Sequence, residues 1–158
     1  MADDTYTVTR SATIDAPPAR VYEQIVDFHN WTNWSPWEDL DPDLKRTYSG
    51  SESGKGAAYA WSGNRKAGEG RMEITEATEP STVHINLAFV KPFKAQSEVA
   101  FTIAPDGTGS RVTWVIDGQK TLMTKVMGVF KSMDSMIGPD LDKGLARLKA
   151  TTEKPAAG

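Results

Sequence analysis

The sequence contains no cysteine and only two histidines, His29 and His84, among its 158 residues. Without thiols the chain has no disulfide scaffold, no thiolate metal site and no cysteine nucleophile, a composition that suits a reducing compartment. Two histidines are too few for a multi-histidine zinc or copper site. We therefore expect neither a metal ion nor another cofactor.

Long apolar runs and an excess of positive charge are missing as well. No stretch approaches the roughly 20 apolar residues that a membrane-spanning helix needs, and the acidic start Met1-Ala2-Asp3-Asp4 is unlike a signal peptide. The 18 basic residues are outnumbered by 21 acidic ones, whereas nucleic-acid binding usually needs a basic stripe. We expect a cytoplasmic protein with no integral membrane segment and no nucleic-acid partner, present as a monomer or weak homodimer.

Acidic residues concentrate near the beginning of the chain. Residues 1–43 carry two basic and nine acidic side chains, and four of the acids are Glu38, Asp39, Asp41 and Asp43. Such a run is usually a solvated loop. The alternative is an acidic surface that docks a partner protein.

Most of the chain shows the two-residue alternation of β-strands. Strands are predicted at 5–15, 44–50, 57–62, 68–78, 81–90, 94–104 and 110–120, separated by turns that contain glycine or proline. In the strand 81–90, Val83, Ile85, Leu87 and Phe89 share one face and polar residues the other. This pattern is typical of an antiparallel sheet with one face in water.

Two helices complete the predicted fold. A short helix begins near Pro17 and ends near Asp27, because proline suits a first helical turn. A long amphipathic helix is predicted over 121–152, where apolar residues recur at steps of three and four. Pro139 lies within it and predicts a kink or a break, since proline lacks an amide N–H. The order of elements predicts one α+β domain over 1–153, followed by a disordered tail at 154–158.

Signals for catalysis are weak in this sequence. The glycine-rich segments 50–56 and 68–70 do not match a phosphate-binding loop and are better read as strand bends. No Gly-x-Ser-x-Gly nucleophile motif is present. His29 is the better of the two histidines for chemistry, although a capping or loop role is favoured. The nearby Trp31, Trp34 and Trp37 form either a lid or an anchor, and the sequence leaves both open.

Several segments together resemble a known family. They are APPARVYEQIVDFHNW, NWSPW, GAAYAWSGN, GEGRMEI, the KPF turn, GSRVTW and the terminal IGPDLDKGLARLK. These segments are similar to the polyketide cyclase/dehydrase-like group of the START-type helix-grip superfamily (SRPBCC proteins) over about residues 5–153. The resemblance implies a curved antiparallel sheet of six or seven strands around a long C-terminal helix, with a deep hydrophobic cavity between them. It implies no universal catalytic residues, because members of this superfamily differ widely in function.

The apolar faces of the predicted elements supply candidate ligand-binding residues. We expect a cavity of about 300 Å³ or more, lined by Trp61, Met72, Phe89, Phe101, Trp114, Met127 and Phe130. Methionine adapts its shape and tryptophan offers a flat apolar wall, which suits a lipid-, polyketide- or quinone-like ligand.

Binding of a hydrophobic or aromatic small molecule is therefore the predicted function. The apolar strand faces hold no Asp, Glu, His or Lys, which favours binding over catalysis. Two alternatives remain open: a polyketide cyclase/dehydrase-type enzyme, whose catalytic residues the sequence does not identify, and a protein–protein interaction module.

Overall fold

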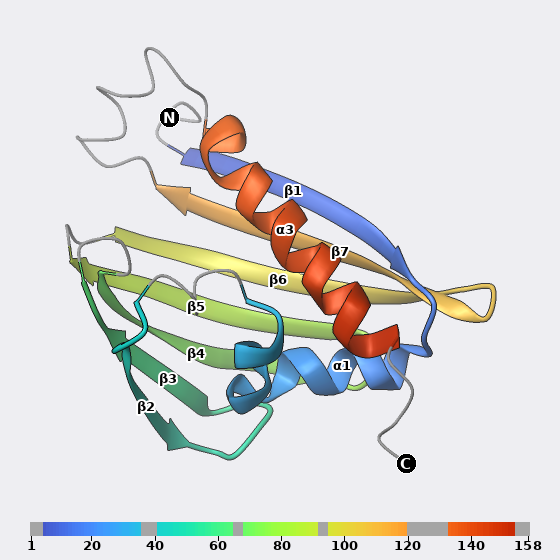
Figure 1. The fold of residues 1–158 in the computed structure, drawn as a ribbon, viewed down its shortest axis with the longest axis horizontal. Helices are drawn as coiled ribbons and strands as arrows, with labels where there is room; N and C mark the ends of the chain where they lie inside the picture. Colours follow the sequence, from blue (N-terminus) through green and yellow to red (C-terminus); the bar gives the residue numbers. More distant parts are fainter. Residues whose placement is uncertain (1–4, 36–40, 65–67, 92–94, 120–132, 154–158) are drawn as a thin grey trace.

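The computed structural model describes residues 5–35, 41–64, 68–91, 95–119 and 133–153. In chain order the elements are β1 (Thr5–Ile14), α1 (Pro18–Val26), the 3₁₀ helix η2 (Phe28–Asn33), β2 (Lys45–Gly50), β3 (Ala57–Ser62), β4 (Glu69–Thr78), β5 (Thr82–Lys91), β6 (Ala95–Asp106), β7 (Gly109–Gln119) and α3 (Met133–Glu153). Figure 1 shows a curved sheet with α3 lying across its β1 and β7 side and α1 near one end of that helix.

The strands form a seven-stranded sheet in the order β1-β7-β6-β5-β4-β3-β2. Every neighbouring pair is antiparallel, as in the pairing of Val8 with Ile116. Strands β2 to β7 follow one another as hairpins, and β1 joins β7 at the edge. The predicted antiparallel sheet and helix-grip fold are thereby confirmed, with strand boundaries within two residues of those expected.

The C-terminal helix packs on the sheet through one apolar stripe. Leu141, Leu145 and Leu148 follow one another at steps of four and three, and all three are buried. They face mainly β1, while the helix also contacts α1 and η2. Part of the predicted helix, residues 121–132, lies outside the described residues.

Pro139 lies inside α3, which runs without interruption from Met133 to Glu153. The alternative of a helix break at Gly138-Pro139 is therefore wrong. The missing proline N–H costs one backbone hydrogen bond, and the buried leucine stripe that follows holds the helix on the sheet.

Two of the clustered tryptophans, Trp31 and Trp34, cap the C-terminal end of α1. A helix leaves its last four carbonyl groups without partners inside the helix. Here the carbonyl of Ile25 accepts from Trp31 Nε1 at 2.8 Å and the carbonyl of Gln24 accepts from Trp34 Nε1 at 2.9 Å. The carbonyls of Glu23 and Val26 accept from Asn30 Nδ2 and the Gly54 N–H, each at 3.0 Å. Trp31 and Trp34 are thus a buried anchor rather than a lid, and Trp37 lies outside the described residues.

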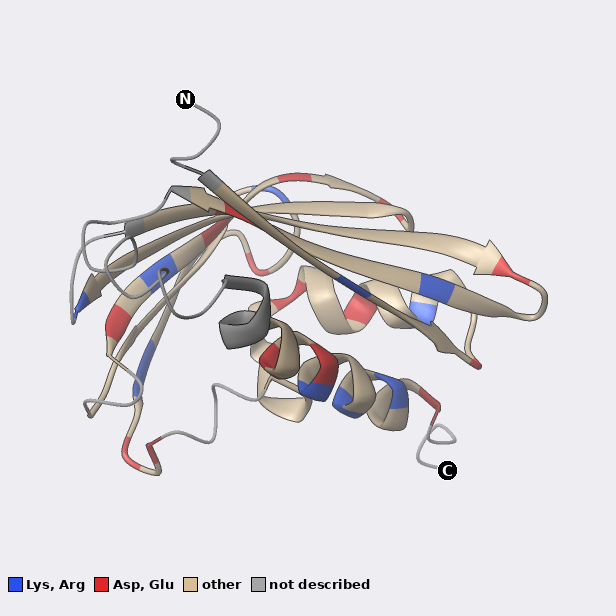
Figure 2. Cartoon of the chain, turned by 90° about the horizontal axis from the view of Figure 1, so that it is seen from above, with Lys and Arg blue, Asp and Glu red and all other residues tan. Residues whose placement is uncertain are grey.

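Charged residues are missing from residues 99–105 of β6 and 112–116 of β7. Figure 2 shows Lys, Arg, Asp and Glu along other strands and on α3, and β4 for example carries Arg71 and Glu73. Among the described residues, no helix has the length and apolar character to span a membrane. The predicted tail, 154–158, lies outside the described part of the chain.

Candidate functional site

The predicted ligand-binding residues fall into two groups, and the first is a closed core. Phe101 and Trp114 are 0% and 1% exposed, and their rings stack with centroids 4.8 Å apart. Trp34 contacts both rings edge-on, with centroids at 6.0 and 5.6 Å. Trp31 does the same from 5.9 and 6.5 Å. The structure therefore places Phe101 and Trp114 under the anchor that follows α1.

The second group lies on the same inner face of the sheet, at the strands farther from α3. Trp61 of β3 and Phe89 of β5 are partly buried, and their rings meet edge-on with centroids 5.7 Å apart. Both residues pair with Gly70 of β4, one from each side. Next along β4, Met72 is 8% exposed and pairs with the partly buried Leu87. These residues, Trp61, Met72, Leu87 and Phe89, are called the inner apolar patch below.

A glycine makes the ring contact in this patch possible. A Cβ atom on Gly70 would lie 2.6 Å from Cη2 of Trp61 and 2.7 Å from the carbonyl oxygen of Ala88. Both distances are shorter than real carbon contacts allow, so the indole ring rests directly on the glycine backbone. The sequence suggested only a strand bend at this position. Met127 and Phe130, the two helix residues of the predicted cavity, lie outside the described residues.

The inner apolar patch continues into a row of aromatic rings. From Trp61 the row passes to Tyr59 at 6.1 Å, to Tyr48 at 5.2 Å and to His29 at 4.0 Å between centroids, each pair stacked. Tyr48 and Tyr59 are direct cross-strand partners on β2 and β3. The row thus links the patch to the segment that follows α1.

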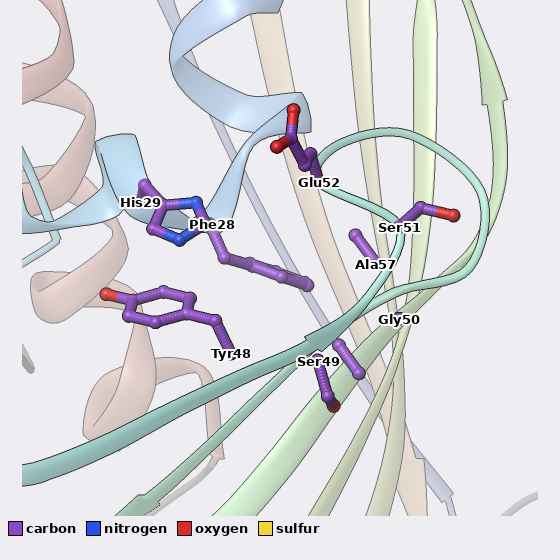
Figure 3. Close-up of a pocket in the computed structure, with 9 residues that line it drawn as sticks. Phe28, His29, Tyr48, Ser49, Gly50, Ser51, Glu52 and Ala57 are labelled. Atoms are coloured by element: carbon purple, nitrogen blue, oxygen red, sulfur yellow. The ribbon is translucent and has the colours of Figure 1, made fainter.

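A hollow of about 240 Å³ opens at the far end of this row. It lies between the junction of α1 with η2 and the β2–β3 hairpin (Figure 3). Its lining residues are Phe28, His29, Tyr48, Ser49, Gly50, Ser51, Glu52, Ala57 and Ala58. The sequence predicted only a turn at residues 51–56. The pairing of Tyr48 with Tyr59 was the available signal, because adjacent aromatic positions on two strands bring rings together.

His29 lies at the rim of this hollow in a fixed orientation. Its backbone N–H and its ring Nδ1 both contact Asp27 Oδ1, at 3.0 and 2.7 Å. Because an ionised carboxylate can only accept, Nδ1 carries a proton and donates it to Asp27. The other ring nitrogen, Nε2, takes no part in this contact. Asp27 is also the N-cap of η2. The capping residue is therefore Asp27, and His29 is the residue that this cap holds at the start of η2.

Solved structures with the same architecture are widespread and distant in sequence. CV1439 from Chromobacterium violaceum superposes with a TM-score of 0.66 at 15% identity, covering 94% of this chain and 99% of that one. Ara h 8.0201 gives 0.65 at 13% identity, covering 94% and 97%. DynU16, described as a protein in the dynemicin biosynthetic locus, gives 0.64 at 14% identity and covers 94% and 47%. At such identities the likeness shows the fold alone.

No curated protein sequence matches the chain. A sequence model of one family does match, over residues 5–153, and this range includes every described helix and strand. The chain belongs to that family, polyketide cyclase / dehydrase and lipid transport.

Proposed function

We propose that this domain binds a hydrophobic or aromatic small molecule, lipid-, polyketide- or quinone-like, between the sheet and the C-terminal helix. The observation that supports this most strongly is the inner apolar patch. Trp61, Leu87 and Phe89 face the concave side of the sheet and keep part of their surface accessible. Apolar surface removed from water contributes about 25 cal/mol per Å², so a ligand that covers these side chains gains affinity from them.

The contrast with the closed core supports the same location. Val99, Phe101 and Val112, on the inner face of β6 and β7, are at most 4% exposed. On the same inner face, Trp61 of β3 and Phe89 of β5 are partly accessible. These strands lie away from β1, which is the strand that α3 mainly contacts. In this proposal Phe101 and Trp114 form the packed floor of the site, while Trp61, Met72 and Phe89 touch the ligand.

The chemistry of the patch favours binding over catalysis. The described inner-face positions from Ala57 to Trp61, Gly70 to Ile74 and Val83 to Phe89 hold no Asp, Glu, His or Lys. General acid–base catalysis needs such a group within hydrogen-bond reach of the substrate. The family description names both cyclase/dehydrase activity and lipid transport, and this apolar lining fits the second.

A dye titration with matched variants tests the proposal. The fluorescent dye ANS is titrated into the wild-type domain and then displaced by quinones, sterols and aromatic polyketides. Phe89→Ala should weaken dye and competitor binding at least tenfold, because it removes a ring from the patch. Val90→Ala is the matched control, since Val90 is the next residue of β5 and is 42% exposed on the opposite face.

The outcomes distinguish a ligand site from an ordinary core. Saturable binding that Phe89→Ala weakens and Val90→Ala leaves unchanged supports the proposal. Equal affinity of the two variants, or no saturable binding by the wild type, contradicts it. Circular dichroism of both variants checks that each one is folded.

A further inference from the structure

We propose that the hollow beside the β2–β3 hairpin is a second ligand site, which binds a small organic ammonium ion with an apolar body. This site is separate from the inner apolar patch. The aromatic row Trp61, Tyr59, Tyr48 and His29 runs between the two, and the lining of the hollow includes none of the residues of the inner apolar patch.

The floor and one wall of the hollow are apolar and firmly held. Phe28 is 2% exposed and contacts Trp31 and Tyr59, with centroids at 5.5 and 5.9 Å. Tyr48 is stacked between His29 and Tyr59, which fixes its ring and leaves its edge toward the hollow. Figure 3 shows Phe28 reaching toward Ala57, with Tyr48 on the strand below. These groups suit the hydrocarbon part of a ligand of modest size, since the volume is about 240 Å³.

The polar groups of the lining offer acceptors and negative charge. Glu52 is a carboxylate on the hairpin, opposite His29 on the helical side (Figure 3). Nδ1 of His29 is held by Asp27 Oδ1 at 2.7 Å, so Nε2 is the ring nitrogen that this contact leaves to a ligand. The described lining residues include no Lys or Arg, so a positive charge at this site would come from the ligand.

The backbone around the hollow argues against an anion. Anion-binding turns present free N–H groups, but three N–H groups of this turn are already occupied. Ser51 donates to Gly56, Gly54 to Val26 and Gly56 to Ile74, over 2.9 to 3.2 Å. The adjoining end of α1 is its C-terminus, which carries the negative end of the helix dipole. An ammonium ion is therefore the charge type that this site accommodates.

Three isosteric probes test the charge preference. Benzylammonium, benzyl alcohol and benzoate share one ring and differ in the charge of the substituent, and each is titrated while the backbone amide NMR signals are followed. We expect benzylammonium to bind at least fivefold more tightly than benzyl alcohol, and benzoate more weakly than either. The shifts should centre on residues 48–58 and on Phe28 and His29.

Matched variants test whether the Glu52 carboxylate binds the ammonium group. E52Q should weaken benzylammonium binding at least fivefold and leave benzyl alcohol unchanged. E76Q, an exposed glutamate of β4 outside the lining, should change neither, and F89A should leave benzylammonium binding intact. Equal binding of amine and alcohol, no effect of E52Q, or shifts centred on Trp61 and Phe89 would each overturn this second site without bearing on the apolar one.

Discussion

Gly70 is the residue whose missing side chain shapes the inner apolar patch. We expect Gly70→Ala to lower the free energy of unfolding by about 1–3 kcal/mol, as overpacking usually does. The new Cβ would meet both the Trp61 ring and the Ala88 carbonyl oxygen. The ring can move, but the backbone carbonyl cannot easily do so. Denaturant unfolding measures the loss, and ANS titration should show at least tenfold weaker binding because Trp61 is displaced.

Gly107→Ala is the control for this substitution. Gly107 has a φ of +61°, and no atom lies within 4 Å of the position that a Cβ would take. Alanine there costs about 1–2 kcal/mol from the backbone alone, and its ANS affinity should equal that of the wild type. If Gly70→Ala also leaves dye affinity unchanged, the contact between Trp61 and Gly70 does not shape the ligand site.

Glu153 gives the fold a pH-dependent contact near the end of the chain. Its Oε2 accepts from Lys149 and, at 2.7 Å, from the backbone N–H of Asp15. These hydrogen bonds hold the pKa of the Glu153 carboxyl below its ordinary value of 4.5. A depressed folded-state pKa contributes stability that is present above the ordinary pKa and is lost as the pH falls through the lowered one.

We therefore expect wild-type stability to fall more steeply below about pH 4.5 than that of Glu153→Gln. Thermal unfolding between pH 7 and 3 measures this difference. Glu76→Gln, at an exposed position of β4, controls for the loss of one surface charge and should follow the wild type. Parallel curves for wild type and Glu153→Gln would show that the contact is unimportant.

At the residue scale, the sequence predicted which way side chains face but not how closely they are covered. Phe89 and Phe101 have the same alternation and the same predicted role. Phe101 is fully buried because Trp31 and Trp34 lie on it, whereas Phe89 has Trp61 at its edge and stays partly accessible. This difference in burial comes from η2 and its C-cap Trp34, which lie far earlier in the chain. The residue pattern of β5 or β6 therefore does not predict it.

At the scale of elements, α1 is held by the segment that follows it. We expect Trp31→Phe to lower the free energy of unfolding by about 1–3 kcal/mol, since it leaves the buried carbonyl of Ile25 without its donor. Asn30→Ala removes a similar bond to the Glu23 carbonyl at an exposed position, where water can replace it. That control should cost less than about 1 kcal/mol. Equal costs in denaturant unfolding would contradict the anchoring role of Trp31.

Pro139 lies inside α3, where it leaves one helical hydrogen bond unmade. Replacing it with alanine restores one helical N–H donor, worth about 1 kcal/mol. The same change frees the unfolded chain and costs about 0.4–1 kcal/mol. We therefore expect Pro139→Ala to be neutral or slightly stabilising in thermal unfolding. A loss of more than about 2 kcal/mol would instead mean that the proline specifies the local backbone.

The elements themselves were largely predictable. The two-residue alternation was clear in the strands around 5–15, 81–90, 94–104 and 110–120, because one sheet face is wet and the other dry. Glycine- and proline-containing turns marked the remaining strands. The tryptophans after α1 were undecided, because their donors reach back to carbonyls at Gln24 and Ile25 that only the folded helix places within range. The hollow beside the hairpin was missed for a similar reason. Its walls come from two segments, around Phe28 and around Glu52, that the sequence does not show as neighbours.

At the scale of the whole molecule, the sheet has a closely packed side and a side with accessible apolar rings. The α3 side of the sheet, with the leucine stripe and the tryptophan anchor, is closely packed. The β3 to β5 side keeps accessible apolar rings on its inner face. In the proposed function, one half of the sheet holds the domain together and the other half accepts the ligand. The family's sequence model spans both halves.

Native mass spectrometry of protein purified from its own host tests this account most directly. The wild type is compared with Leu87→Trp, in which a larger side chain fills the inner apolar patch, and circular dichroism confirms that both are folded. We predict that the wild type carries an apolar molecule of defined mass and that Leu87→Trp has lost it. A wild type that carries nothing and binds no hydrophobic probe saturably, or equal ligand occupancy in both proteins, would contradict a ligand site at this patch.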